Sequence, residues 1–168
     1  MAGWSVPDQP TDYSTTRPVP ESTPPSRLTL PPPPRIPGQA IFLVAAAAAL
    51  LLGAVATNYY AAHDLTLSHY DAKAHLVVAR RIFDSLTPGW RQIGAVWLPL
   101  PHVLNALPVQ VDAWYRTGSS GVVISMLSFA AAAGSLAWLI ASLTGSRAAA
   151  VAAVAAFIYQ PDLLYLQA

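Results

Sequence analysis

The chain has 168 residues, of which 54% are hydrophobic and only 10% are charged, and its mean hydropathy is +0.43. Soluble domains carry about 25% charged residues, so this composition is typical of a membrane protein. Because the chain has no cysteine, it can have no disulfide, thiolate nucleophile or cysteine-based zinc site. Its net charge of +1, with no concentrated basic face, argues against nucleic acid as a partner.

Residues 1–38 contain eleven of the sixteen prolines, including the run Pro31–Pro34. Proline removes backbone donors and favours extended conformations, and this stretch has few apolar side chains to bury. We expect a disordered, Pro-rich tail. Basic residues on the two sides of the expected membrane segments nearly balance, so charge counting favours neither orientation. We adopt the topology with a cytoplasmic N-terminus.

Residues 39–62 are predicted to form the first transmembrane helix. The uncharged stretch 40–62 would reach roughly 34 Å as a helix, enough to cross a hydrocarbon core of about 30 Å. Residues 118–144 are predicted to form the second transmembrane helix. Its many alanines, glycines and serines, Gly134 among them, would let neighbouring helices approach closely.

Residues 147–166 are predicted to form a short third transmembrane helix that bends at Pro161. The sequence stops at Ala168, directly after the apolar LLYLQA. We therefore expect the N-terminal part of a longer chain whose remaining helices pack against this part. The predicted fold class is an all-α membrane protein with two to three transmembrane helices. A large extracytoplasmic loop would contain amphipathic juxtamembrane helices.

That loop, residues 63–117, contains nine of the seventeen charged residues and is much longer than a simple connection. Its segment 68–85, SHYDAKAHLVVARRIFDS, has apolar side chains at helical spacing. The stripe predicts an amphipathic helix on the outer membrane face, and Ser68 with Asp71 resembles a weakened capping box. The stripe comprises Ala72, Leu76, Ala79 and Phe83, and Val78 and Ile82 widen it.

Asp71 and His75 are four residues apart and would share one face of this helix. Asp71 could act as a catalytic base towards an acceptor hydroxyl. The pair could also be half of a metal site, with a further ligand from His63, His69 or His102. Alternatively, Asp71 only favours the positive end of the helix, and His75 is an interfacial side chain.

Four basic residues of the loop could bind a phosphate, or could be attracted to anionic lipid in general: Lys73, Arg80, Arg81 and Arg91. The following WRQIGAVWLPLPHVLNALPV contains three prolines, which exclude one regular helix. Its tryptophans would lie at the headgroup level, so the stretch is expected either to dip into the membrane interface or to begin a short helix at His102. His102 could contact substrate or make a structural hydrogen bond.

After the first span, three segments follow in an order that resembles polytopic GT-C glycosyltransferases: HYDAKAHLVVARRIFDS, WLPLPHVLNAL and YQPDLLYLQA. This superfamily includes protein O-mannosyltransferases and the aminoarabinose transferases of lipid A. The resemblance covers about residues 40–168 and rests on loose motifs. It implies that a sugar, hexose or pentose, is transferred from a polyprenyl-phosphate donor to an acceptor on the outer face of the cell membrane.

In that resemblance Asp71 matches the acidic residue that serves as base or substrate-orienting carboxylate. The substrate-binding candidates are Lys73, His75, Arg80, Arg81 and His102. Many relatives carry two adjacent acidic residues here, whereas Ala72 follows Asp71, so no metal ligand is assigned and a divalent-metal requirement stays open. With three spans alone, the piece is expected to be inactive.

Two other classes remain. One is a small non-catalytic membrane protein whose loop binds lipid or a partner subunit. The other is a transporter fragment, which is weakened because neither long span carries an ionisable group at its centre.

Overall fold

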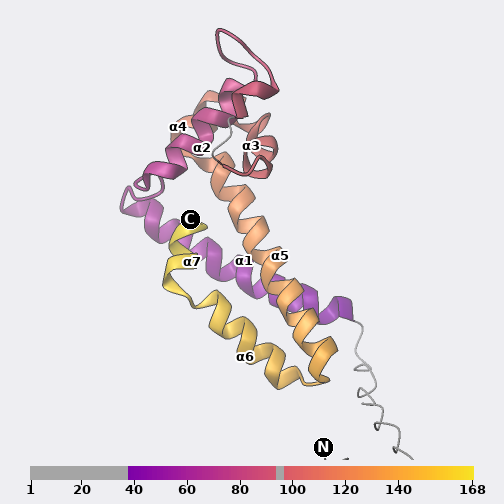
Figure 1. Cartoon of the computed structure of the whole chain (residues 1–168). Coiled ribbons are helices and arrows are strands. Elements are labelled where there is room, and N and C mark those ends of the chain that lie inside the picture. Colours follow the sequence, from indigo (N-terminus) through magenta and orange to yellow (C-terminus); the bar gives the residue numbers. More distant parts are fainter. Residues whose placement is uncertain (1–37, 94–96) are drawn as a thin grey trace, which may run out of the picture. The chain divides into compact units, whose positions relative to one another are not determined.

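The computed structural model describes residues 38–93 and 97–168, so the predicted tail lies outside the described part. Within these ranges the structure contains helices, turns and irregular segments but no strand. Figure 1 shows their arrangement. In chain order the elements are α1 (Gly38–Ala62), α2 (Tyr70–Arg81), η1 (Trp90–Ile93), α3 (Leu100–Asn105), η2 (Pro108–Gln110), α4 (Asp112–Thr117), α5 (Ser119–Thr144), α6 (Arg147–Ile158) and α7 (Pro161–Leu166).

Two helices in the described ranges, α1 with 25 residues and α5 with 26, are long and apolar enough to cross a membrane. The segment expected to form a third span is instead broken into α6 and α7. Pro161 has no amide hydrogen to donate and holds Gln160 in an extended conformation with ψ 115°. The 12 residues of α6 reach only about 18 Å, too short to cross a core of about 30 Å.

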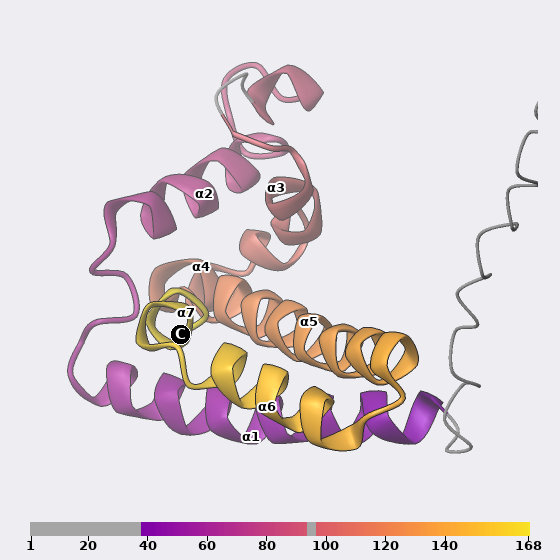
Figure 2. The same ribbon diagram turned by 60° about the horizontal axis from the view of Figure 1, so that its bottom comes forward.

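Helices α1 and α5 run antiparallel and pack through small side chains. Phe42, near the start of α1, lies against Gly134 in the second half of α5. Alanines allow the two backbones to approach closely along the contact. Stacked rings of Phe129 and Phe157, with centroids 5.3 Å apart, join α5 to α6. Figure 2 shows α1, α5 and α6 side by side. Their buried core comprises Ala45, Ala49, Phe129, Ala130, Ala133, Ala137, Val154 and Ile158.

The last helix folds back onto α1 and the start of the loop. The ring of Tyr165 packs edge-on against Tyr60, with centroids 5.2 Å apart. Its hydroxyl lies 2.7 Å from the Ser68 hydroxyl oxygen. Buried Gln167 donates from Nε2 to the carbonyl oxygen of Gly53, 3.2 Å away. The segment after Pro161 is thereby fastened both to α1 and to the loop.

The amphipathic helix expected over 68–85 is shorter, and two details of that expectation are wrong. No side chain caps the amino end of α2, where the N-cap residue is His69. The Ser68 hydroxyl instead donates to the Leu65 carbonyl, 2.7 Å away. At the other end Phe83 of the predicted stripe is half exposed, whereas Ile82, which widens that stripe, is buried as predicted. The helix ends at Arg81, which places the two side chains in a turn.

The apolar face of α2 is covered by the chain itself rather than left free for lipid. Leu76 and Ala79 form a buried cluster with Val109 of η2, and Leu67 and Tyr115 pack around it. Burial of this stripe explains why the loop folds into a compact structure, because apolar area is removed from water without a bilayer.

We predict that Gly134→Ala weakens the packing of α1 on α5. A Cβ atom at this position would lie 2.9 Å from the backbone oxygen of Phe42, which cannot move away without shifting α1. Overpacking of this kind costs about 1–3 kcal/mol. Thermal unfolding of the detergent-solubilised protein, followed by circular dichroism, measures the loss.

Gly121→Ala is the matched control, because its Cβ would make an ordinary contact 3.4 Å from Leu76 Cδ2. Both variants gain the same helix propensity. Equal unfolding temperatures for the two variants would contradict close packing at Gly134.

Candidate functional site

Two histidines from different helices meet at the centre of the loop. Nδ1 of His75 on α2 lies 2.8 Å from Nε2 of His102 on α3. In such a hydrogen bond one ring nitrogen carries the proton and the other accepts it. Trp97 packs beside the pair, with its ring centroid 4.7 Å from that of His75. The contact joins residues 27 positions apart and holds α3 against α2.

His102 is fully buried, and its surroundings favour the neutral ring. Burial lowers the pKa of His102, and the neighbouring charge of His75 lowers this pKa further. The second ring nitrogen of His102, Nδ1, has no hydrogen-bond partner among the described residues. A side chain with 0% exposure cannot touch a substrate unless α3 moves. The structural alternative for His102, a hydrogen bond that positions α3, therefore fits the geometry.

Asp71 and Lys73 lie on the exposed surface of α2. Asp71 is in the first turn of the helix, where a carboxylate is favoured by the helix dipole. Neither side chain makes an ion pair or a side-chain hydrogen bond within the described ranges. His75 bonds to His102, and no hydrogen bond joins His75 to Asp71 within the described ranges. Asp71 and Lys73 are therefore accessible to a ligand.

Arg80 is engaged within the protein and connects α2 to α4. Its Nε donates to Asp84 at 3.0 Å, its Nη2 donates to Asp112 at 2.6 Å, and its guanidinium lies 4.6 Å from the ring centre of Tyr115. The hydrogen bond from Arg80 holds the pKa of Asp112 below its usual value. Arg81, in the last turn of α2, remains exposed. Of the two adjacent arginines, only Arg81 has a free guanidinium for phosphate in this arrangement.

The structure brings one of the candidate metal ligands, His102, next to His75 but does not assemble a complete set. His102 joins His75, whereas His63 uses Nδ1 to bond the Tyr59 carbonyl at 2.7 Å. Within 38–93 and 97–168 no group of three or more histidine or acidic side chains could hold a metal ion. Asp71 is thus not part of a recognisable metal centre in the described ranges.

Sequence reasoning missed Asp112, Tyr115 and Trp97 as partners in this loop. Each partner is supplied by another segment of the loop, and Asp112 is 32 positions from Arg80. Helical periodicity identifies neighbours three or four residues apart and carries no signal for such contacts. The prolines around Trp97 and His102 were the available hint, because they predict a chain that turns back on itself.

Comparison of the chain with protein-family models, curated proteins and solved structures found no match.

We predict that the contact between α2 and α3 weakens below the ordinary histidine pKa of about 6.5. The pKa of His102 is lowered in the folded loop. At a pH between this lowered pKa and the ordinary histidine pKa, the unfolded loop therefore binds more protons than the folded loop. The contribution of neutral His102 to the stability of the loop is therefore fully present above about pH 6.5 and is lost as the pH decreases through this window. Hydrogen exchange in Tyr70–Arg81, corrected for intrinsic rates, should be several-fold faster at about pH 5.5 than at about pH 7.5.

His102→Gln, which keeps a hydrogen-bonding group but does not titrate, should lose most of this pH dependence. His63→Gln removes an exposed histidine and should retain it. The same pH dependence in His102→Gln as in the unchanged protein would refute the role of His102.

We predict that Arg80→Gln loosens α4 while Arg81→Gln does not. Arg80→Gln removes two ion pairs and the contact with Tyr115, and because both carboxylates are exposed the loss should be confined to the α4 region. Hydrogen exchange over Asp112–Thr117 should rise only in Arg80→Gln. Equal exchange in the two variants would mean that Arg80 does not hold α4.

Proposed function

We propose that the chain is the N-terminal part of a multi-pass glycosyltransferase of the cell membrane. The enzyme would move a sugar from a polyprenyl-phosphate donor to an acceptor on the outer face. The observation that carries the proposal is a folded helix that exposes one carboxylate and two cations along its length, in a loop between two membrane-length helices. The carboxylate is Asp71, and the cations are Lys73 and Arg81.

The position of the loop suits a lipid-linked donor. The phosphate of such a donor lies at the headgroup level, and its sugar projects into water above the bilayer. In the proposed topology, with a cytoplasmic N-terminus, α1 ends at Ala62 on the outer side and α5 starts there at Ser119. Helix α2 lies between these two points in the chain. The carboxylate and the cations of α2 would therefore lie at the membrane surface where the donor phosphate is presented.

In the proposed reaction Asp71 accepts the proton of an acceptor hydroxyl, and the hydroxyl oxygen attacks the anomeric carbon of the sugar. The bond from that carbon to the phosphate oxygen breaks, and polyprenyl phosphate leaves with the bonding electrons. Lys73 and Arg81 would stabilise the negative charge that develops on the phosphate. His75, His102 and Arg80 would act as positioning residues, because each holds α2 against another part of the loop.

The proposed partners are the bilayer, the polyprenyl-phosphate sugar and the remaining helices of a longer chain. These helices would supply the rest of the cavity that encloses donor and acceptor. A divalent metal is not assigned to any residue described here. The identity of the sugar depends on walls that these helices would form.

A non-catalytic membrane protein is the second candidate, and the exposed apolar side chains of the loop favour it. Leu86 is fully exposed, and five further apolar side chains of the loop are more than half exposed. Such a surface would suit a partner subunit or the headgroup region. The residues are Tyr70, Leu86, Trp90, Leu98, Leu100 and Leu107.

We predict that Asp71→Asn in the full-length protein lowers sugar transfer by about 10²–10⁴-fold, because the base is lost while size and hydrogen bonding are kept. Membranes that contain the protein are supplied with radiolabelled undecaprenyl-phosphate mannose or undecaprenyl-phosphate arabinose, and label in the acceptor fraction is counted. Insertion and amount of the variant are checked by immunoblot.

Asp64→Asn is the matched control. Asp64 has a positive φ of 56°, which asparagine also adopts readily, so the change removes an exposed charge without strain. Full transfer by Asp71→Asn would remove Asp71 from the mechanism. Absence of transfer by the unchanged full-length protein from both donors would favour the non-catalytic candidate.

A further inference from the structure

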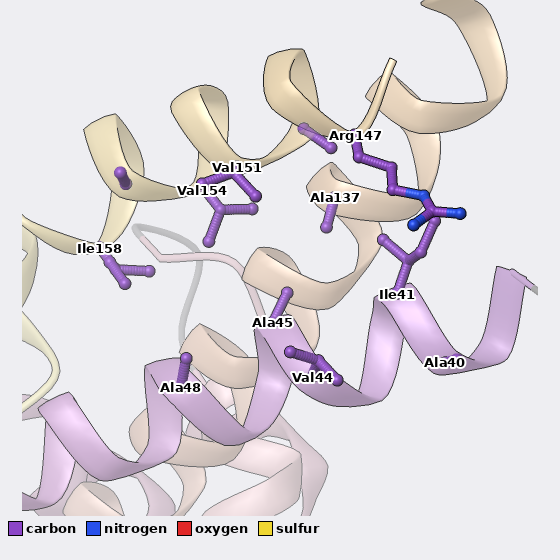
Figure 3. A pocket seen from close by; sticks show the side chains of 12 residues that line it. Ala40, Ile41, Val44, Ala45, Ala48, Ala137, Arg147, Val151, Val154 and Ile158 are labelled. Atoms are coloured by element: carbon purple, nitrogen blue, oxygen red, sulfur yellow. The ribbon is translucent and has the colours of Figure 1, made fainter. Parts of the chain in front are cut away.

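An apolar groove lies at the opposite end of the long helices from α2. It has a volume of about 430 Å³ and is formed by the first half of α1, the end of α5 and the whole of α6. Figure 3 shows its side chains converging from α1 and α6, with Arg147 beside Ile41 at one end. Most of the lining is alanine or branched aliphatic, including Ile41, Val44, Ala48, Val151 and Val154.

The length of the groove along α6 is about the thickness of one leaflet of a membrane. It follows α6 from Arg147 to Ile158, which corresponds to about 18 Å of helix. The hydrocarbon core of a bilayer is about 30 Å thick, so one leaflet contributes about half of that value. An acyl chain that extends from the membrane surface to the midplane would therefore match the groove in length and polarity.

Arg147 is the one charged residue among those that line the groove. It is the first residue of α6, and no acidic residue occurs in α1, α5 or α6. The side chain is exposed and makes no ion pair within the described ranges. The positive end of the α6 dipole adds to its charge. This end of the groove is therefore suited to an anion and the rest to a hydrocarbon chain.

We propose that the groove binds one acyl chain of an anionic glycerophospholipid, whose phosphate accepts hydrogen bonds from the Arg147 guanidinium. Charge complementarity favours this occupant, because its phosphate supplies an anion for the exposed Arg147, whereas an additional apolar helix supplies none. In the proposed topology Arg147 and Gly38 lie on the cytoplasmic side, where anionic lipids attract basic residues. The proposal requires membrane insertion but is independent of sugar transfer.

The test uses the full-length protein in detergent, with phosphatidylglycerol and phosphatidylcholine that have identical acyl chains. Native mass spectrometry measures the fraction of protein that retains each lipid. The unchanged protein should prefer phosphatidylglycerol, and Arg147→Gln should lower its retention about fivefold, to the level of phosphatidylcholine. Arg116→Gln, which removes an exposed arginine of α4 outside the groove, should keep the preference.

A second pair of variants tests the groove itself. Ala48→Leu fills the groove from α1 and should reduce the retention of both lipids. Ala47→Leu adds the same volume to an exposed position of α1 outside the lining and should leave retention unchanged. Thermal unfolding of both variants shows whether the helices still pack.

Two results would overturn the proposal. One is unchanged phosphatidylglycerol retention by Arg147→Gln. The other is a change in oligomeric state with Ala48→Leu at constant lipid retention, which would mean that a helix of a second copy occupies the groove.

Discussion

Close packing of α1 on α5 determines where every other element can lie. Gly134 allows Phe42 to approach to a distance that a side chain at position 134 would prevent, and alanines continue the contact along both helices. The antiparallel pair fixes the point from which the loop leaves α1 and the point at which it re-enters α5. It also fixes the start of α6, because only a short turn joins α6 to α5. The loop and the groove thus occupy opposite ends of one helical pair.

Polar contacts then determine the conformation of the loop. Its apolar cluster is small, with three buried residues, and by itself would define the orientation of α2 only loosely. Arg80 fixes one side of α2 to α4, and the bond between His75 and His102 fixes the other side to α3. These residues resemble ligand-binding groups in the sequence but act between segments of the chain. The side chains that remain accessible, Asp71 among them, are presented on a surface that these contacts hold in place.

Sequence alone predicts the elements whose signal is local. Uninterrupted hydropathy over more than 20 residues predicts α1 and α5, and periodic apolar positions predict the centre of α2 around Leu76. The ends of α2 were predicted less well, because Ser68 bonds to a neighbouring carbonyl instead of capping the helix. The partners of Arg80 and His75 could not be predicted, since they depend on how the proline-rich part of the loop folds back. Pro161 predicted a bend in the third apolar segment. It did not predict that α6 would be too short to cross the bilayer.

Tyr165 gives the end of the described chain an influence on the loop. Its hydroxyl meets Ser68 two residues before α2 begins, while its ring rests on Tyr60 in the last turns of α1. Helix α6 forms one wall of the groove and continues through a single bend into α7. The Tyr165 hydroxyl is consequently a direct contact between the segment that follows α6 and the segment that precedes α2.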